Sequence, residues 1–321
     1  MNPLLAPYLH FILPSIIIGI SAIANGIGQG IAAVAGLNAI NTQPQARDDI
    51  SNTLILGLAL IETGGVLCFI TCLYAFRGFE DFLFLNPYPY YAEIGIGLLF
   101  ILTAGPVGIV SAFPVKSACE SIARQPFFAG KIKTLMLVNQ TFLQAPIIFA
   151  FLLVMFAKPL IAEVTTWSQA LQIISSGIAF GLGSFGPILG LGIFTTAICK
   201  NIGLNKNAYR QLLFFTFASE AVISSSIIFA LIIALFILKM VHTPFHEALS
   251  GIHFLSAALA IGLSTFGVGI SSGRISAQGA YEIAMNPENS SNIMKFCLLS
   301  QAMIETCTLY GLTIAFMILL I

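Results

Sequence analysis

Charged side chains are scarce in this sequence of 321 residues, in which 13 Lys and Arg and 13 Asp and Glu make up only 8%. A typical soluble domain has about 25%. A surface that dissolves in water cannot be built from so few charges. The net charge is zero, and a neutral chain lacks the basic surface that binds the phosphates of nucleic acids. The composition therefore argues against a soluble domain and against nucleic-acid binding.

Cysteine and histidine do not form a metal-binding pattern. The six cysteines contain no CxxC pair, and no histidine accompanies them at the spacing of a zinc site. We expect them to be small packing residues. His242 and His246 lie four residues apart, but Pro244 stands between them and disfavours a shared helical face. The sequence therefore predicts no resident metal ion and no cofactor.

Apolar residues, in contrast, fill 58% of the chain, and the mean hydropathy is +0.96. A helix needs about 20 mostly apolar residues to span a bilayer, and eight such stretches occur. No Lys or Arg precedes the first one, and it is too long for the apolar region of a signal peptide. The sequence predicts an all-α membrane protein with eight transmembrane helices. The stretches run from Leu9 to Gly36, Leu54 to Ala75, Ile94 to Val115, Leu135 to Ala157, Ile173 to Ile198, Leu212 to Leu238, Ile252 to Gly273 and Phe296 to Ile321.

Basic residues are distributed unevenly between the connections of these stretches. The first, third, fifth and seventh connections, with their flanks, hold ten Lys and Arg, whereas the others hold only Arg77, Lys158 and Lys239. Lys and Arg near the ends of spans favour the cytoplasmic side of the membrane. We therefore expect the odd-numbered connections to be cytoplasmic and both termini to lie outside.

The eight stretches alternate in character and form a fourfold repeat. Odd-numbered stretches are rich in glycine and other small residues, which favour close helix packing, and even-numbered ones are bulky with one polar residue near the middle. This alternation predicts four tandem helical hairpins. Their expected boundaries are 1–78, 79–158, 159–240 and 241–321.

Each polar residue follows the turn of its hairpin at the same offset of eighteen positions. Glu62 follows Pro44, Gln144 follows Pro126 and Glu305 follows Pro287. In the third hairpin the proline is lost, and Glu220 follows Asn201-Ile202 at the same offset. This offset corresponds to about 27 Å of helix, less the length of the turn itself, which places these side chains near the middle of a membrane.

A charged side chain at that depth costs roughly 2.5–3.5 kcal/mol, so such residues usually mark the path of an ion or proton. Gln144 cannot carry a charge, and its position has lost the carboxylate. We therefore expect Glu62, Glu220 and Glu305 to carry three ions on four hairpins.

The turns and carboxylates together resemble the proteolipid, or c subunit, of F-type and related rotary ATP synthases. The unit of that family is a hairpin with a glycine-rich inner helix, a cytoplasmic Arg-Gln-Pro turn and an outer helix that holds the ion-binding carboxylate. Arg124-Gln125-Pro126 reproduces the whole turn, and Gln43-Pro44 and Asn286-Pro287 reproduce part of it. The resemblance covers the chain as four fused hairpins.

The resemblance implies a rotor-ring subunit that catalyses no ATP chemistry itself. Its implied partners are copies of itself in a ring, membrane lipid, the stator a subunit and central-stalk subunits. The implied location is the bacterial inner membrane. Each loaded glutamate would cross the lipid neutral and release its ion near the essential arginine of the stator. The implied contacts to the central stalk are Gln43, Pro44, Arg124, Gln125, Pro126, Asn286 and Pro287.

The same resemblance bears on which ion is transported. Sodium-binding relatives place a glutamine on the inner helix, fifteen positions before the turn proline, and a hydroxyl directly after the glutamate. Gln29 and Thr63 take these places around Glu62. Glu305 is followed by Thr306, and Tyr310 could donate a hydrogen bond to a neighbouring carboxyl group. We expect protons, with sodium as the alternative.

Two other kinds of membrane protein fit the repeats. One is a secondary transporter with repeated hairpins and a mid-membrane substrate site, which Pro106 and Pro187 would suit. The other is a scaffold that transports nothing and would leave the buried glutamates without a purpose.

Overall fold

The computed structural model describes residues 6–76, 86–240 and 251–320, which are helical and contain no strand. Eight segments in this part are long and apolar enough to cross a membrane, as the sequence predicted. The predicted hairpin boundaries at 79 and 241, and the residues Arg77, His242, Pro244 and His246, lie outside the described residues. The helices are α1 (Ala6–Thr42), α2 (Arg47–Phe76), α3 (Tyr88–Val110), α4 (Ala112–Arg124), α5 (Ala129–Ala162), α6 (Trp167–Ile202), α7 (Tyr209–Lys239), α8 (Ile252–Met285) and α9 (Ser290–Leu320).

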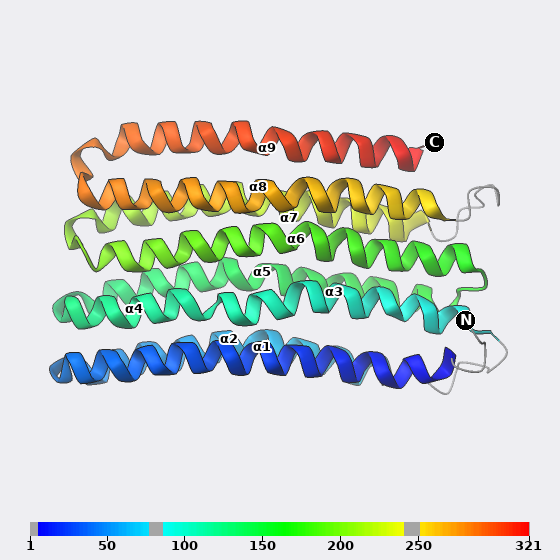
Figure 1. The fold of residues 1–321 in the computed structure, drawn as a ribbon, viewed down its shortest axis with the longest axis horizontal. Helices are drawn as coiled ribbons and strands as arrows, with labels where there is room; N and C mark the ends of the chain where they lie inside the picture. Colours follow the sequence, from blue (N-terminus) through cyan, green and yellow to red (C-terminus); the bar gives the residue numbers. More distant parts are fainter. Residues whose placement is uncertain (1–5, 77–85, 241–250, 321) are drawn as a thin grey trace.

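The helices form two rows (Figure 1). One row is α1, α3 with α4, α6 and α8, and the other is α2, α5, α7 and α9, with neighbours in each row in contact. Four short 3-10 turns lie together at one end, and the two termini lie at the other. These turns are η2 (Pro44–Ala46), η3 (Pro126–Phe128), η4 (Lys206–Ala208) and η7 (Pro287–Asn289). The chain is thus a stack of four hairpins whose turns share one end.

Glycines set the spacing of the first row, which we call the inner row. A Cβ at Gly28 of α1 would overlap the carbonyl oxygen of Gly108 in α3, and a Cβ at Gly190 of α6 would overlap that of Gly269 in α8. Without side chains between them, the backbones approach closely and pack by van der Waals contact, which is the main attraction between helices in lipid. This is the glycine-rich row that the sequence predicted.

One predicted span is divided in the structure. The stretch from Ile94 to Val115 is broken at Ser111, between α3 and α4. Pro114 has no N–H to donate to the carbonyl of Val110, four residues earlier. The missing bond accounts for an interruption of the helix at this position.

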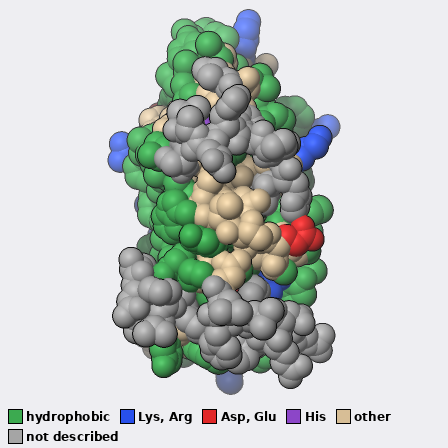
Figure 2. Space-filling model, turned by 90° about the vertical axis from the view of Figure 1, so that its right-hand side faces the viewer, with side chains coloured by type: hydrophobic (Ala, Val, Ile, Leu, Met, Phe, Trp, Pro, Cys, Tyr) green, Lys and Arg blue, Asp and Glu red, His purple; other side chains and the backbone are tan. Residues whose placement is uncertain are grey.

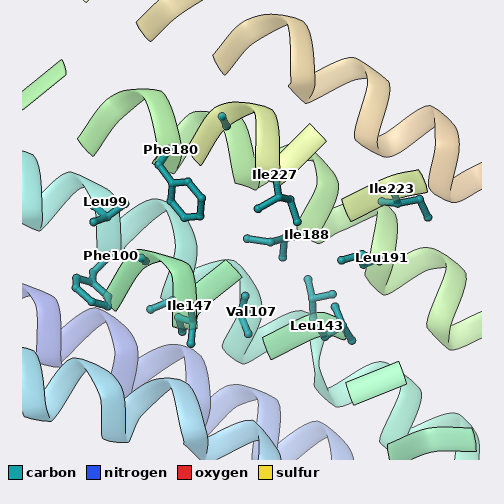
Figure 3. Close-up of a cluster of buried hydrophobic side chains, with 14 of the residues drawn as sticks. Leu99, Phe100, Val107, Leu143, Ile147, Phe180, Ile188, Leu191, Ile223 and Ile227 are labelled. Atoms are coloured by element: carbon teal, nitrogen blue, oxygen red, sulfur yellow. The ribbon is translucent and has the colours of Figure 1, made fainter. Parts of the chain in front are cut away.

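Large apolar side chains fill the space between the two rows (Figure 3). Phe100 of α3, Ile147 of α5, Phe180 of α6 and Ile227 of α7 are among them, and each is at most 1% exposed. Interlocking of these side chains holds the rows in register. Since lipid tails are as apolar as leucine, packing rather than exclusion from water stabilises such a core.

The outer surface of the chain is also apolar. In the most apolar stretch of 18 residues, 72% of the residues are buried in the span of α6, but only 17% in the span of α9. Viewed from the end opposite the turns, the described part of the molecule shows broad hydrophobic flanks with few charged groups (Figure 2). Lipid or further protein must cover these flanks.

Candidate ion-binding sites

Side chains at the turns show which residues of the hairpins are equivalent. Gln125 Nε2 donates a hydrogen bond to the carbonyl oxygen of Gly203 (2.9 Å), and Asn205 Nδ2 donates one to that of Ala284 (2.8 Å). Gln125 directly precedes η3, and Asn205 directly precedes η4. Each acceptor lies three residues before the first residue of the next 3-10 turn. Asn205-Lys206 is therefore the counterpart of Gln125-Pro126.

The predicted third turn at Asn201-Ile202 is wrong, because both residues are buried and still belong to α6. The other three helices that enter a turn are separated from it by one residue, whereas three residues, 203–205, follow α6. Because this connection has no turn proline, no residue marks its greater length in the sequence. Glu220 consequently lies fourteen positions after Lys206, where its 3-10 turn starts, and Ser224 stands at the eighteenth.

Glu305 lies in a site between two hairpins. Ser225 and Ser226 of α7 donate hydrogen bonds to its Oε1 at 2.7 and 2.8 Å. Ser226 Oγ is also 3.4 Å from Thr308 Oγ1. The residue is partly exposed, but its Oε2 is buried and has no hydrogen-bond partner in the described part of the chain. This glutamate is therefore held through one oxygen by side chains of the preceding hairpin, while part of its side chain lies at the surface.

Glu62 is exposed at the free edge of the stack. Gln29 Nε2 of α1 donates a hydrogen bond of 3.3 Å to its Oε2. Both side chains line a groove of about 410 Å³, together with Asn25 and the α2 residues Gly65 and Phe69. The first hairpin thus presents an incomplete, open version of the site around Glu305.

Gln144 occupies the same level in the second hairpin and is buried. Its Nε2 donates a hydrogen bond of 3.2 Å to Ser111 Oγ. Gln140, one turn earlier in α5, donates one of 2.7 Å to the carbonyl oxygen of Ser111. The two amides therefore brace the inner helix where it is interrupted.

Glu220 is surrounded differently from the other two glutamates. It is 0% exposed, and neither carboxyl oxygen has a hydrogen-bond partner in the described part of the chain. Leu212, Phe215 and Ile223 of the same helix are also fully buried. Its side chain lies in the core rather than in an open site.

The remaining predicted site residues make no hydrogen bond to a carboxyl group within the described part of one chain. Thr63 Oγ1 donates a hydrogen bond to the carbonyl oxygen of Ala59, and Thr306 Oγ1 donates one to that of Met303. Tyr310 is 68% exposed. If these hydroxyls act on an ion site, the site has to include a second copy of the chain.

Sequence reasoning missed three residues near the carboxylates. Ser225 and Ser226 bind Glu305 from another hairpin, and Asn25 lines the groove of Glu62. The run Ser224-Ser225-Ser226 in an otherwise apolar helix was the available signal. Its partner could not be read from the spacing, because that partner belongs to the next hairpin along the chain.

A buried ionic cluster at the end opposite the turns was also missed. Glu93 of α3 lies 2.9 Å from His10 Nδ1 of α1 and 3.3 Å from Lys158 Nζ of α5. Lys158 also donates to the carbonyl oxygen of Ala75 in α2, at 3.2 Å. The cluster joins all four long helices of the first two hairpins, and we call it the outer-end clamp.

Repeated apolar helical hairpins define an integral multi-pass membrane protein, and its mid-helix carboxyl groups are candidate ion sites. The family model for the c subunit of ATP synthase matches residues 12–75 and 255–318, which contain Glu62 and Glu305. The ATP synthase c subunit of Thermosynechococcus vestitus is 46% identical over 65 residues, which is 20% of this chain and 79% of that protein. The second ATP synthase c subunit of Cereibacter sphaeroides is 37% identical over 71 residues, 22% of this chain and 77% of that protein. The chain belongs to this family of ATP synthase proteolipids, and each of these relatives is about as long as one of its hairpins.

Proposed function

We propose that the chain is a rotor-ring subunit of a rotary ATP synthase or ATPase and carries protons on mid-membrane glutamates, with sodium as the alternative ion. The main support is Glu305, which lies eighteen positions after Pro287 and accepts two hydrogen bonds from the preceding hairpin. Such a group is held by the protein and still lies partly at the surface of the chain. Glu62 has the same spacing from its turn.

A ring of copies would complete the site of Glu62. Glu305 contacts Ser225 and Ser226, which lie 19 and 20 positions after the start of η4. The equivalent residues of the last hairpin are Thr306 and Cys307. A neighbouring copy whose α9 packs against α2 would therefore place these two residues, and the nearby Tyr310, over the groove of Glu62. In such a ring the inner row faces a lumen plugged by lipid.

The turns provide the proposed contact with the central stalk. The helices of the second row (α2, α5, α7 and α9), which we call the outer helices, provide the proposed contacts with lipid and with the stator a subunit. Phe127 is fully exposed at the tip of the second turn, beside the exposed Arg124. An exposed aromatic residue next to a cation suits a protein contact better than water. This arrangement supports a stalk contact at the turns, and the basic residues on that side favour cytoplasmic turns and outer termini. The bacterial relatives support a place in the bacterial inner membrane.

Glutamine substitutions test the proposal directly. We expect Glu62→Gln or Glu305→Gln to abolish at least nine tenths of ATP-driven ion pumping in membrane vesicles, because an amide cannot release an ion. Glu163→Gln, at the exposed end of α5, is the matched control and should pump normally. Pumping at the wild-type rate in both site variants would refute the proposal and favour the secondary-transporter alternative. Repeating the assay with and without sodium distinguishes the two ions.

A further inference from the structure

The outer helices carry two layers of polar side chains. Glu62, Gln144, Ser224 and Glu305 lie eighteen positions after the starts of their turns. Gln140, Glu220 and Gln301 lie fourteen positions after them, where the first hairpin has the apolar Leu58 instead. We call the first set the site layer and the second the inner polar layer. The two are separated by four residues, which is about 6 Å along a helix and about 40° around it.

Side chains of the inner polar layer face the interior of the chain. Gln140, Glu220 and Gln301 are all 0% exposed. Gln140 Nε2 donates to the carbonyl oxygen of Ser111, and Gln301 Nε2 donates to Ser276 Oγ at 2.6 Å. Both amides therefore link an outer helix to the inner helix of the same hairpin, which is a structural role.

In the site layer, by contrast, both glutamates lie at least partly at the surface of the chain. Glu62 is exposed, and Glu305 is partly exposed in the gap between α7 and α9. An ion carrier must meet water or a counter-charge at every revolution, so this exposure is required. Glu220 does not have it.

Ionisation of Glu220 in its position would be unfavourable. Both of its oxygens lack a hydrogen-bond partner among the described residues, and the effective cost of burying an uncompensated ion is several kcal/mol. The neutral form avoids that cost. A group that stays neutral in the core cannot load and release an ion.

We infer that Glu220 is a neutral structural member of the inner polar layer, and that each chain carries transported ions on Glu62 and Glu305 only. This inference rests on the proposed function. It gives two carriers on four hairpins, rather than the three that the sequence spacing predicted. The family match to the first and fourth hairpins agrees with it. In a ring the two carriers would be adjacent across each junction between copies and followed by two silent hairpins.

Labelling of the wild-type complex tests the inference without any variant. Dicyclohexylcarbodiimide reacts with neutral carboxyl groups that are accessible from lipid. We expect mass spectrometry of the exhaustively treated chain to show at most two adducts, on Glu62 and Glu305. A third adduct on Glu220 would overturn the inference.

Two variants of the intact complex add a functional measurement. Glu220→Gln should leave the ions pumped per ATP unchanged, whereas the double substitution Glu220→Gln with Ser224→Glu should raise that ratio by about one half, from two to three carriers per chain. Loss of pumping in assembled Glu220→Gln complex, or an unchanged ratio in the double variant, would refute it. If Glu62 and Glu305 are not labelled and their glutamine variants pump normally, the proposed function itself fails. If only Glu220 departs from expectation, the proposed function stands.

Discussion

At the scale of single residues, what distinguishes a carrier is its surroundings rather than its identity. Glu305 and Glu220 are both glutamates on outer helices, yet the first accepts hydrogen bonds from two serines and the second accepts none from the described chain. Hydrogen bonds to a charged group contribute about 1.5–3 kcal/mol each. The serines therefore make the ionised form of Glu305 attainable at the moment of exchange.

Substituting these serines tests this account. Removing both hydroxyls with Ser225→Ala and Ser226→Ala should slow ATP-driven pumping roughly tenfold or more, since each lost bond disfavours the ionised carboxyl group by at least about 1.5 kcal/mol. Ser224→Ala is the control, because Ser224 Oγ has no hydrogen-bond partner in the described chain. Equal rates for the control and the double variant would contradict the role given to the serines.

At the scale of helices, the outer-end clamp fixes the first hairpin against the second. His10 and Glu93 come from inner helices, and Lys158 comes from an outer one. Glu93 and Lys158 side chains are only 6% and 10% exposed. A buried ionic group needs its partner, because the remaining charge is otherwise left in a medium that does not solvate it.

Loss of one partner in the clamp should therefore destabilise the chain. We expect Lys158→Met to lower the free energy of unfolding by about 3–5 kcal/mol, measured by denaturant titration of the purified chain in detergent. Lys239→Met, at the exposed end of α7, should change it by no more than about 0.5 kcal/mol. Combining Lys158→Met with Glu93→Leu should restore part of the lost stability. A single variant as stable as the control would remove the clamp from this account.

The same scale shows what could be predicted from the sequence. The eight spans and their alternation were predictable, because the length of an apolar stretch and its glycine content can be read within each span alone. The levels of Glu62 and Glu305 were predictable because a proline fixes the turn before each of them. The sequence put Glu220 eighteen positions after its hairpin turn, whereas the structure puts it fourteen positions after. The longer third connection carries no proline that would have shown this difference. Contacts such as those of Ser225 or Lys158 join residues 65 to 80 positions apart, and no local pattern encodes them.

At the scale of the whole molecule, the two edges of the stack are complementary in the repeat. The first edge presents Glu62 in an open groove, and the last presents α9, whose most apolar window is only 17% buried. Glu305 already shows how a carboxyl group packs against the preceding hairpin. Joining the last edge of one copy to the first edge of the next would repeat that contact.

Cross-linking tests this junction through a cysteine that the chain already contains. Cys307 is exposed on α9, at the position equivalent to Ser226. We expect Glu62→Cys to be joined to Cys307 of a neighbouring copy by a short bifunctional thiol reagent, giving a ladder of multimers on a denaturing gel. Adding Cys307→Ser should abolish the ladder. Multimers that persist without Cys307 would place the junction elsewhere.

Fusion of four hairpins into one polypeptide has a consequence for how such a rotor can evolve. A ring built from identical copies of one hairpin would have the same ion site at every position, so a change in that gene would alter all of the sites at once. Here the four hairpins are joined in one chain from α1 to α9, so each ion site is encoded by its own codons. In the proposed ring, substituting one residue in one hairpin would change the number of ions moved per ATP without changing the diameter of the ring. If the chain forms the proposed ring, its ion carriers can therefore be lost one at a time during evolution.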